Sequence, residues 1–104
     1  MTRQPGDTTE IGIRTFFHED TFTFTHLLVD KSTSRAAIID PVLDFDQKSG
    51  RTATAFIDGI LAEVREQSLI LDYVLETHAH ADHLTAADYI RSQSGARIVI
   101  GAAI

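Results

Sequence analysis

Hydrophobic and polar residues alternate along the first part of the chain. Residues 21–29 read TFTFTHLLV, so that two phenylalanines, a histidine and a leucine share one face, and mainly threonines occupy the other. Period-two alternation of this kind is typical of a half-buried strand. Residues 11–17 and 36–40 are also rich in strand-forming residues, and the turn-forming residues 30–35 connect the second segment to the third. The pattern therefore predicts three strands joined as a hairpin or meander.

A helical spacing of apolar residues appears further along the chain. Residues 53–67 carry apolar side chains three and four positions apart, at Phe56, Ile57, Ile60, Leu61 and Val64. This spacing predicts an amphipathic helix, for which Thr52 or Thr54 is the N-cap. Residues 84–94 predict a second helix, which ends at Gly95.

Two further strands and one loop complete the pattern. Residues 69–77 and 97–100 are short apolar runs, which suit strands of a sheet. The proline after Asp40 ends the third strand, because it cannot donate to a ladder and restricts Asp40 to an extended conformation. Residues 41–52 then form a loop that pivots at Gly50. The predicted order is β-β-β-α-β-α-β, an α/β fold in which helices cover a sheet.

Composition narrows the class of protein but does not indicate its function. The chain is long enough for a single domain, residues 1–104, and we expect residues 1–10 to be flexible because they lack periodicity. With 15 acidic and 9 basic side chains the net charge is −6, which argues against a nucleic-acid groove. The chain has no cysteine and no apolar run of membrane-spanning length, and its polar first residues, MTRQPGDTTE, are unlike a signal peptide. We therefore expect a cytoplasmic domain with no nucleic-acid or membrane partner.

The candidate chemistry lies between the apolar run 69–77 and the second helix, where the sequence reads THAHADH. In an extended stretch His78 and His80 project to the same side, so both imidazoles can bind one cation. The chain then turns and brings Asp82 and His83 beside them. Imidazole and carboxylate groups are suitable ligands for Zn²⁺, Fe²⁺ or Mn²⁺, and α/β proteins place their sites at strand ends. These four residues are therefore the predicted metal ligands.

Other interpretations remain open for several polar residues. Asp82 could simply cap a helix that starts near His83. Asp40 either orients a ligand histidine from outside the ligand set or accepts amide hydrogen bonds in its own loop. His18 and His26 are lone histidines, which are more often surface or core residues than ligands. His26 shares a strand face with phenylalanines, so we expect a hydrogen-bonded histidine in the core.

The histidine motif resembles the hallmark of the metallo-β-lactamase fold superfamily, in which a THxHxDH loop follows a buried strand. The stretches IIDPVLDFD (38–46), SGRT (49–52) and LETHAHADHLTAA (75–87) look like the bacterial persulfide dioxygenases related to glyoxalase II. The similarity extends from about residue 22 to residue 100. It implies the N-terminal half of an αβ/βα sandwich.

The resemblance also implies a metal-dependent enzyme. Persulfide dioxygenases hold one Fe(II) with two histidines and one aspartate, and oxidise glutathione persulfide to sulfite and glutathione. By motif position His78 is the iron ligand, and His80, Asp82 and His83 lie outside the ligand set or on the substrate side, with Asp82 the candidate catalytic residue. Zinc hydrolases of the superfamily use all four as ligands. In the alternative, a glyoxalase II-type enzyme, zinc-bound hydroxide attacks a glutathione thioester, and Asp82 and His83 hold a second metal.

The chain departs from the family pattern near its end. In the family, a further histidine and aspartate come from the second half of the sandwich, whereas no histidine follows His83 here. We therefore expect a truncated chain that is inactive by itself, and whether it holds a metal stays open. The exposed sheet face predicts a homodimer. As a third interpretation, the missing C-terminal ligands favour a non-catalytic half-domain for association or metal storage. Lys48 or Arg51 could meet a glutathione carboxylate, although a solvated loop charge is the simpler interpretation.

Overall fold

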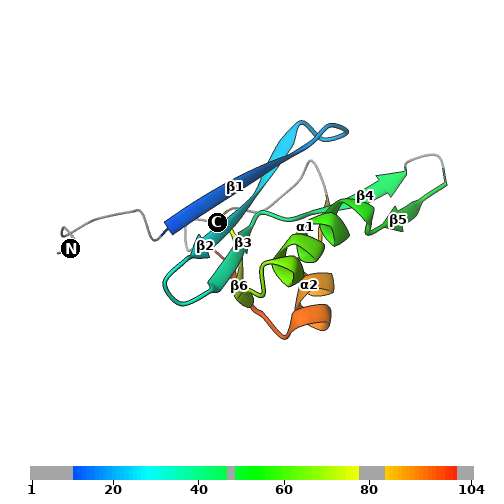
Figure 1. The fold of residues 1–104 in the computed structure, drawn as a ribbon. Helices are drawn as coiled ribbons and strands as arrows, with labels where there is room; N and C mark the ends of the chain where they lie inside the picture. Colours follow the sequence, from blue (N-terminus) through cyan, green and yellow to red (C-terminus); the bar gives the residue numbers. More distant parts are fainter. Residues whose placement is uncertain (1–10, 47–48, 78–83, 101–104) are drawn as a thin grey trace.

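The computed structural model describes residues 11–46, 49–77 and 84–100, which form two sheets and two helices (Figure 1). Residues 1–10, for which we predicted flexibility, lie outside this part of the chain. The larger sheet has the strand order β1-β2-β3-β6-β8, and the smaller sheet has the order β5-β4-β7. The elements are β1 (Ile11–His18), β2 (Thr23–Asp30), β3 (Arg35–Ile39), β4 (Val42–Asp46), β5 (Arg51–Ala53), α1 (Ala55–Glu66), β6 (Ile70–Glu76), β7 (Leu84–Thr85), α2 (Ala87–Ser94) and β8 (Arg97–Ile100).

The larger sheet contains both antiparallel and parallel pairs. β1, β2 and β3 pair antiparallel as a meander, which confirms the three strands predicted for this part of the chain. β3 then pairs parallel with β6, and β6 pairs parallel with β8. Each parallel connection carries a helix, because parallel neighbours need a long crossover. The predicted order β-β-β-α-β-α-β is therefore confirmed for this sheet and its helices.

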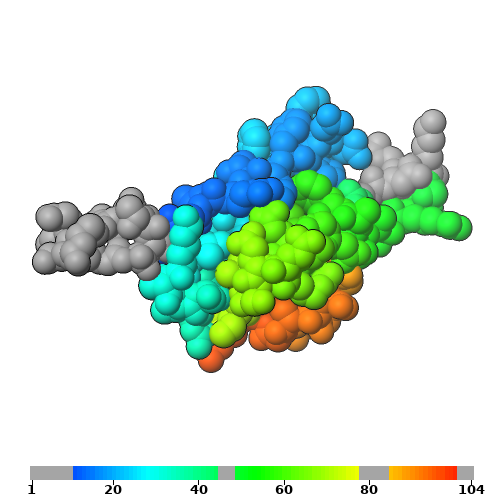
Figure 2. Space-filling view, in the orientation of Figure 1, coloured from blue at the N-terminus to red at the C-terminus, as the bar shows by residue number. Residues whose placement is uncertain are grey.

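Both helices cover the same face of the larger sheet, and they lie side by side in Figure 2. The core between sheet and helices contains Leu27, Val29, Ala36, Ile38, Leu71 and Val74 from the strands, Ile57, Ile60, Leu61 and Val64 from α1, and Ala87 and Ile90 from α2. Full burial of one leucine or isoleucine stabilises the fold by about 1.5–3 kcal/mol, so this layer fixes the helices on the sheet. No helix in the described part of the chain is long and apolar enough to cross a membrane.

The face of β2 that enters the core differs from the expectation. Leu27 and Val29 face the helices, whereas Phe24 and His26 lie on the opposite face of the sheet. The imidazole Nδ1 of His26 is 3.0 Å from Oγ1 of Thr15 on the neighbouring strand, in an exposed hydrogen bond. The prediction of a core position for His26 is therefore wrong. Alternation defines the two faces of a strand, but it does not tell which face the helices cover.

Residues 41–52 contain strands of the smaller sheet where a loop was predicted. β4 pairs antiparallel with β5 on one side and with β7 on the other. Gly50 turns the β4–β5 hairpin with a φ of +69°, so the predicted pivot is confirmed. The loop prediction is wrong because one partner of β4, the short strand β7, comes from beyond α1 and β6.

The start of α2 lies later than predicted, whereas its end agrees with the prediction. The helix begins at Ala87, with Ala86 at the N-cap position, so Asp82 is not the N-cap residue of a helix that starts near His83. Gly95 ends the helix in the left-handed conformation with a φ of +77°, and its N–H donates to the carbonyl of Arg91 at 2.8 Å. The glycine signal was reliable because a left-handed C-cap favours glycine.

The N-terminus of α1 is capped by a residue that is distant in the sequence. Thr54 occupies the N-cap position, as one of the two predicted alternatives, but its hydroxyl donates to Oδ2 of Asp58 at 2.7 Å. Instead, Oδ2 of Asp44 on β4 accepts the N–H of Phe56 at 3.1 Å. A carboxylate at this position also meets the positive end of the helix dipole. The smaller sheet is thereby bonded to the first turn of α1.

Candidate metal centre

The predicted metal ligands belong to the segment between β6 and β7, residues 78–83, which we call the histidine segment. His78, His80, Asp82 and His83 lie outside the described residues, so their arrangement stays a prediction. The structure describes both ends of the segment. The contacts at these two ends determine where the segment starts and where it returns to the fold.

The N-terminal end of the histidine segment is bound by Asp40. Its Oδ1 accepts the backbone N–H of Thr77 at 2.9 Å, and its Oδ2 accepts the Thr77 hydroxyl at 2.7 Å. The backbone N–H of Asp40 donates to the carbonyl of Leu75 at 2.8 Å, directly beyond the β3–β6 ladder. Because Thr77 immediately precedes His78, the carboxylate holds the last residue before the predicted ligands.

The backbone of Asp40 is left-handed, with a φ of +54°. The predicted extended conformation is therefore wrong, although residues before proline generally favour it. A left-handed conformation costs roughly 1–2 kcal/mol for a residue other than glycine, so other interactions must compensate. The carbonyl of Asp40 accepts the hydroxyl of the buried Thr25 at 2.8 Å, in addition to the bonds to Leu75 and Thr77. Strained residues that are held in this way are concentrated at functional sites.

The hydrogen bonds of Asp40 bear on its two predicted roles. The described carboxylate bonds go to Thr77, which is 37 positions away. This arrangement supports a role in holding the histidine segment. Direct orientation of a ligand histidine stays a prediction, because the histidines lie outside the described residues.

The C-terminal end of the histidine segment is bound by β4. Val42 lies opposite Thr85 and Leu43 lies opposite Leu84 in an antiparallel pair that follows the segment directly. The backbone N–H of Ala86, the residue after Thr85, donates to the carbonyl of Pro41 at 3.2 Å. The segment therefore returns to the same short stretch of chain from which its other end is held.

One stretch, residues 40–43, thus binds both ends of the histidine segment. The segment follows the carboxyl end of β6, the edge of the sheet where α/β proteins place their sites. Three imidazoles and one carboxylate within six positions are donors that fit a divalent transition metal. Within residues 11–46, 49–77 and 84–100, no group of three histidines, aspartates or glutamates could hold a metal ion. The histidine segment remains the candidate centre.

A polar cluster that the sequence patterns did not indicate lies beside the smaller sheet. His18 is only 5% exposed, and its Nε2 is 2.8 Å from Oδ1 of Asp44. Its Nδ1 is 2.9 Å from Oγ1 of Thr21. His18 was expected to be a surface or core residue, and the structure places it in a buried position whose hydrogen-bond partner stands 26 positions away. The one sequence feature that points to this pair is the carboxylate of Asp44, which lies within a stretch of strand-forming residues.

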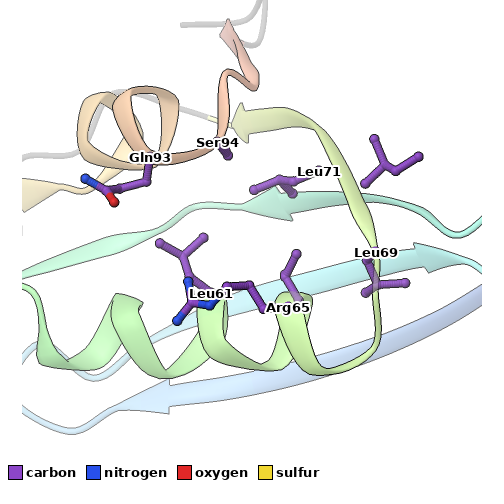
Figure 3. Close-up of a pocket in the computed structure, with 8 residues that line it drawn as sticks. Leu61, Arg65, Leu69, Leu71, Gln93 and Ser94 are labelled. Carbon is purple, nitrogen blue, oxygen red and sulfur yellow. The ribbon is translucent and has the colours of Figure 1, made fainter.

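A cavity of about 310 Å³ lies at the far end of β6 (Figure 3). It opens between the C-terminal ends of α1 and α2, and Leu69 and Leu71 line it where β6 begins. The histidine segment follows the other end of this seven-residue strand, and a strand of that length spans about 20 Å. The cavity is therefore separate from the candidate centre.

Of the two loop cations, Arg51 is exposed at the start of β5 and Lys48 lies outside the described residues.

The fold and the histidine motif together define a class of protein. The model of the metallo-beta-lactamase superfamily matches residues 5–104, and this chain belongs to that superfamily. The α/β architecture described above is the one expected from that resemblance.

Individual relatives narrow the similarity. The chain is 50% identical over 86 residues to a beta-lactamase hydrolase-like protein of Xylella fastidiosa (strain 9a5c), covering 83% of this chain and 20% of that protein. It is 36% identical over 92 residues to the mitochondrial persulfide dioxygenase ETHE1 of Homo sapiens, covering 88% of this chain and 32% of that protein. The crystal structure of ETHE1 from Myxococcus xanthus matches with a TM-score of 0.69 and 35% identity, over 83% of this chain and 33% of that chain. The resemblance to persulfide dioxygenases is confirmed, and the chain spans about one fifth to one third of the length of these relatives.

Proposed function

We propose that this chain supplies the histidine-rich part of the metal centre of a persulfide dioxygenase. The observation that carries the proposal is the double attachment of the histidine segment to residues 40–43, at the carboxyl end of β6. A donor segment that is held at both ends is preorganised for metal binding. The identity of 36% with the human persulfide dioxygenase supports this choice within the superfamily. The residues proposed for this site are His78, His80, Asp82 and His83.

The four residues of the histidine segment do not all have the same role in this proposal. Fe(II), when bound, supplies the one-electron chemistry that O₂ requires. His78 binds the metal. Asp40 orients His78 through its hydrogen bonds to Thr77. His80, Asp82 and His83 lie outside the ligand set or on the substrate side, with Asp82 as the catalytic residue. The overall reaction converts glutathione persulfide, O₂ and water into glutathione and sulfite.

Metal content and oxygen uptake of the full-length protein test this function. Protein reconstituted with Fe(II) under argon should contain one iron per chain, consume O₂ in the presence of glutathione persulfide and release sulfite in equal amount. His78→Ala should lose iron and oxygen uptake, whereas the control Asp88→Asn, on the exposed face of α2, should keep both. Absence of oxygen uptake from protein that holds its full iron content would contradict the proposal.

The alternative is a zinc-dependent thioester hydrolase of the glyoxalase II type. It is favoured by the number of donors in the motif, because four donors can be shared between two metal ions. In that case Asp82 and His83 hold the second zinc, and hydroxide attacks a glutathione thioester. Two zinc ions per chain, with thioester hydrolysis and no oxygen uptake, would select this alternative.

The 104-residue chain by itself should be a poor catalyst. A divalent metal in an enzyme needs three or four protein ligands in a defined geometry. In the proposed dioxygenase the histidine segment supplies one of these ligands, His78, and the described residues contain no group of three that could hold a metal ion. Oxygen uptake by this chain at the rate of the full-length protein would contradict the expectation. A chain that binds metal without turnover would fit the non-catalytic half-domain.

The sheet face opposite the helices is apolar and exposed. Phe17 and Phe24 lie opposite each other on this face of β1 and β2, with Ile13 beside them, and Tyr73 and Val99 extend it across β6 and β8. These five side chains are between 42% and 65% exposed. We infer that a second copy covers this face when the 104-residue chain is on its own, because such apolar patches favour association. Sedimentation should show a dimer at micromolar concentration, and a monomer would contradict the inference.

A further inference from the structure

The imidazole of His18 joins three elements of the fold. His18 ends β1, and its Nδ1 is bonded to Thr21 in the turn before β2. Its Nε2 is bonded to Asp44 on β4. The imidazole and the ring of Phe56 at the start of α1 pack in a T-shaped arrangement, with 4.8 Å between the ring centroids. Both ring nitrogens therefore have partners, and the imidazole itself is buried.

Asp44 divides its two carboxylate oxygens between two partners. Oδ1 is bonded to His18, and Oδ2 accepts the N–H of Phe56 in the first turn of α1. One carboxylate thus connects β4 with β1 and with the helix at the same time. These two bonds contribute to the position of β4 relative to the larger sheet, together with the burial of Val42 and the packing of Leu43 against the core.

β4 is the strand that binds the C-terminal end of the histidine segment. Asp44 directly follows Leu43, which pairs with Leu84 just after that segment. We propose that His18 and Asp44 form a positioning pair that fixes β4 and, through β4, the return of the histidine segment to the fold. Asp40 positions one end of the segment and the His18–Asp44 pair positions the other. The consequence for metal binding rests on the proposed function.

Hydrogen exchange in the full-length protein tests the pair without any metal. His18→Phe keeps an aromatic ring against Phe56 and removes both hydrogen bonds. In this variant the N–H of Ala86, which is bonded to the carbonyl of Pro41, should exchange at least about tenfold faster. His18→Gln should restore most of the protection, because its amide can still donate to Asp44.

Metal affinity provides the second measurement. Competition with a chelator should show that His18→Phe binds Zn²⁺ about tenfold more weakly, the lower end of the effect of residues that support metal ligands. Glu63→Gln is the matched control, because Glu63 also ties β1 to α1, through its ion pair with Arg14 at 3.1 Å, and β4 takes no part in that pair. This control should change neither measurement by more than about twofold.

The outcomes separate this inference from the proposed function. Unchanged exchange at Ala86 in a folded His18→Phe protein overturns the positioning pair. If that variant does not fold, Asp44→Asn is measured in its place, and unchanged exchange again overturns the inference. A wild-type protein that binds no Zn²⁺ or Fe(II) would overturn the proposed function alone, because faster exchange at Ala86 would still support the pair.

Discussion

Replacement of Asp40 separates the two contributions that this residue makes, its carboxylate bonds to Thr77 and its left-handed backbone. Asp40→Ala removes the carboxylate and leaves the backbone strain. Asp40→Gly also removes the carboxylate, but glycine adopts a φ of +54° without strain. Asp40→Asn keeps the shape of the side chain, one acceptor oxygen and the tolerance of a left-handed backbone. The three variants therefore rank the two contributions.

The size of each effect follows from the hydrogen bonds. A hydrogen bond to a charged group contributes about 1.5–3 kcal/mol, and we expect about 1–2 kcal/mol for each bond here because Thr77 is exposed. Loss of both bonds in Asp40→Ala should then cost about 2–4 kcal/mol. Relative to Asp40→Ala, Asp40→Gly should gain roughly 1–2 kcal/mol of stability, because glycine relieves the backbone strain. It should lose about 0.5–1 kcal/mol through the greater entropy of its unfolded chain. Asp40→Asn should lose about one bond, or about 1–2 kcal/mol.

Urea unfolding of the metal-free protein, followed by circular dichroism, measures these differences. The expected order of stability is wild type, Asp40→Asn, Asp40→Gly and Asp40→Ala. Asp88→Asn is the control, because Asp88 is an exposed carboxylate of α2 that pairs with Arg91. Its substitution should change the free energy of unfolding by at most about 0.5 kcal/mol.

Two results would refute the reasoning on Asp40. If Asp40→Ala were as stable as the wild type, the carboxylate bonds to Thr77 would contribute nothing. If Asp40→Gly were less stable than Asp40→Ala, the left-handed backbone would not be strained. Metal affinity gives an independent check, because Asp40→Asn should bind the metal about tenfold more weakly if the residue also positions the histidine segment.

The remaining predictions concern the helices and the core. Gly95→Ala should lose about 1 kcal/mol in urea unfolding, because a Cβ there meets no atom within 4 Å and only the φ of +77° is unfavourable; a loss of several kcal/mol would contradict this. The hydroxyl of Tyr89 donates to Asp58 and is the largest cause of the lowered pKa of that carboxyl, whose ordinary value is 3.8. A carboxyl whose pKa is lowered in the folded state stabilises the fold above its ordinary value, and this stabilisation is lost as the pH falls below it. In Tyr89→Phe the free energy of unfolding should therefore fall less steeply as the pH is lowered. An unchanged dependence on acidic pH would argue against the bond. Ile38→Ala should cost about 2–5 kcal/mol of unfolding free energy, because Ile38 is fully buried in the sheet, and a loss below 1 kcal/mol would contradict the packing.

Local spacing was sufficient for most elements of the larger sheet and its helices. The apolar spacing of α1 and the alternation of β1 and β2 predicted these elements, because each repeat reflects one buried face of a regular structure. Gly95 predicted the end of α2 because a left-handed cap excludes most other residues. The histidine motif predicted its own position at the end of β6, since the ligand types and their spacing are adjacent in the chain.

Contacts between distant residues could not be predicted in this way. Which face of β2 is buried depends on where the helices pack, so His26 was placed in the core and lies outside it. β7 has only two residues, too few for a pattern, and β4 lies between Pro41 and Gly50, whose residue types favoured a loop. The partners of His18 and the strained backbone of Asp40 likewise depend on residues from other strands.

The sequence by itself determined the family, the main elements and the candidate ligands, because each of these is encoded by residues that are close together in the chain. Only the tertiary structure decided that residues 40–43 hold both ends of the histidine segment and that His18 and Asp44 anchor the strand involved. The physical reason is the same in both cases. Hydrogen bonds such as those from Thr77 to Asp40 form only after β3 and β6 have paired, and no local pattern records which strands will become neighbours.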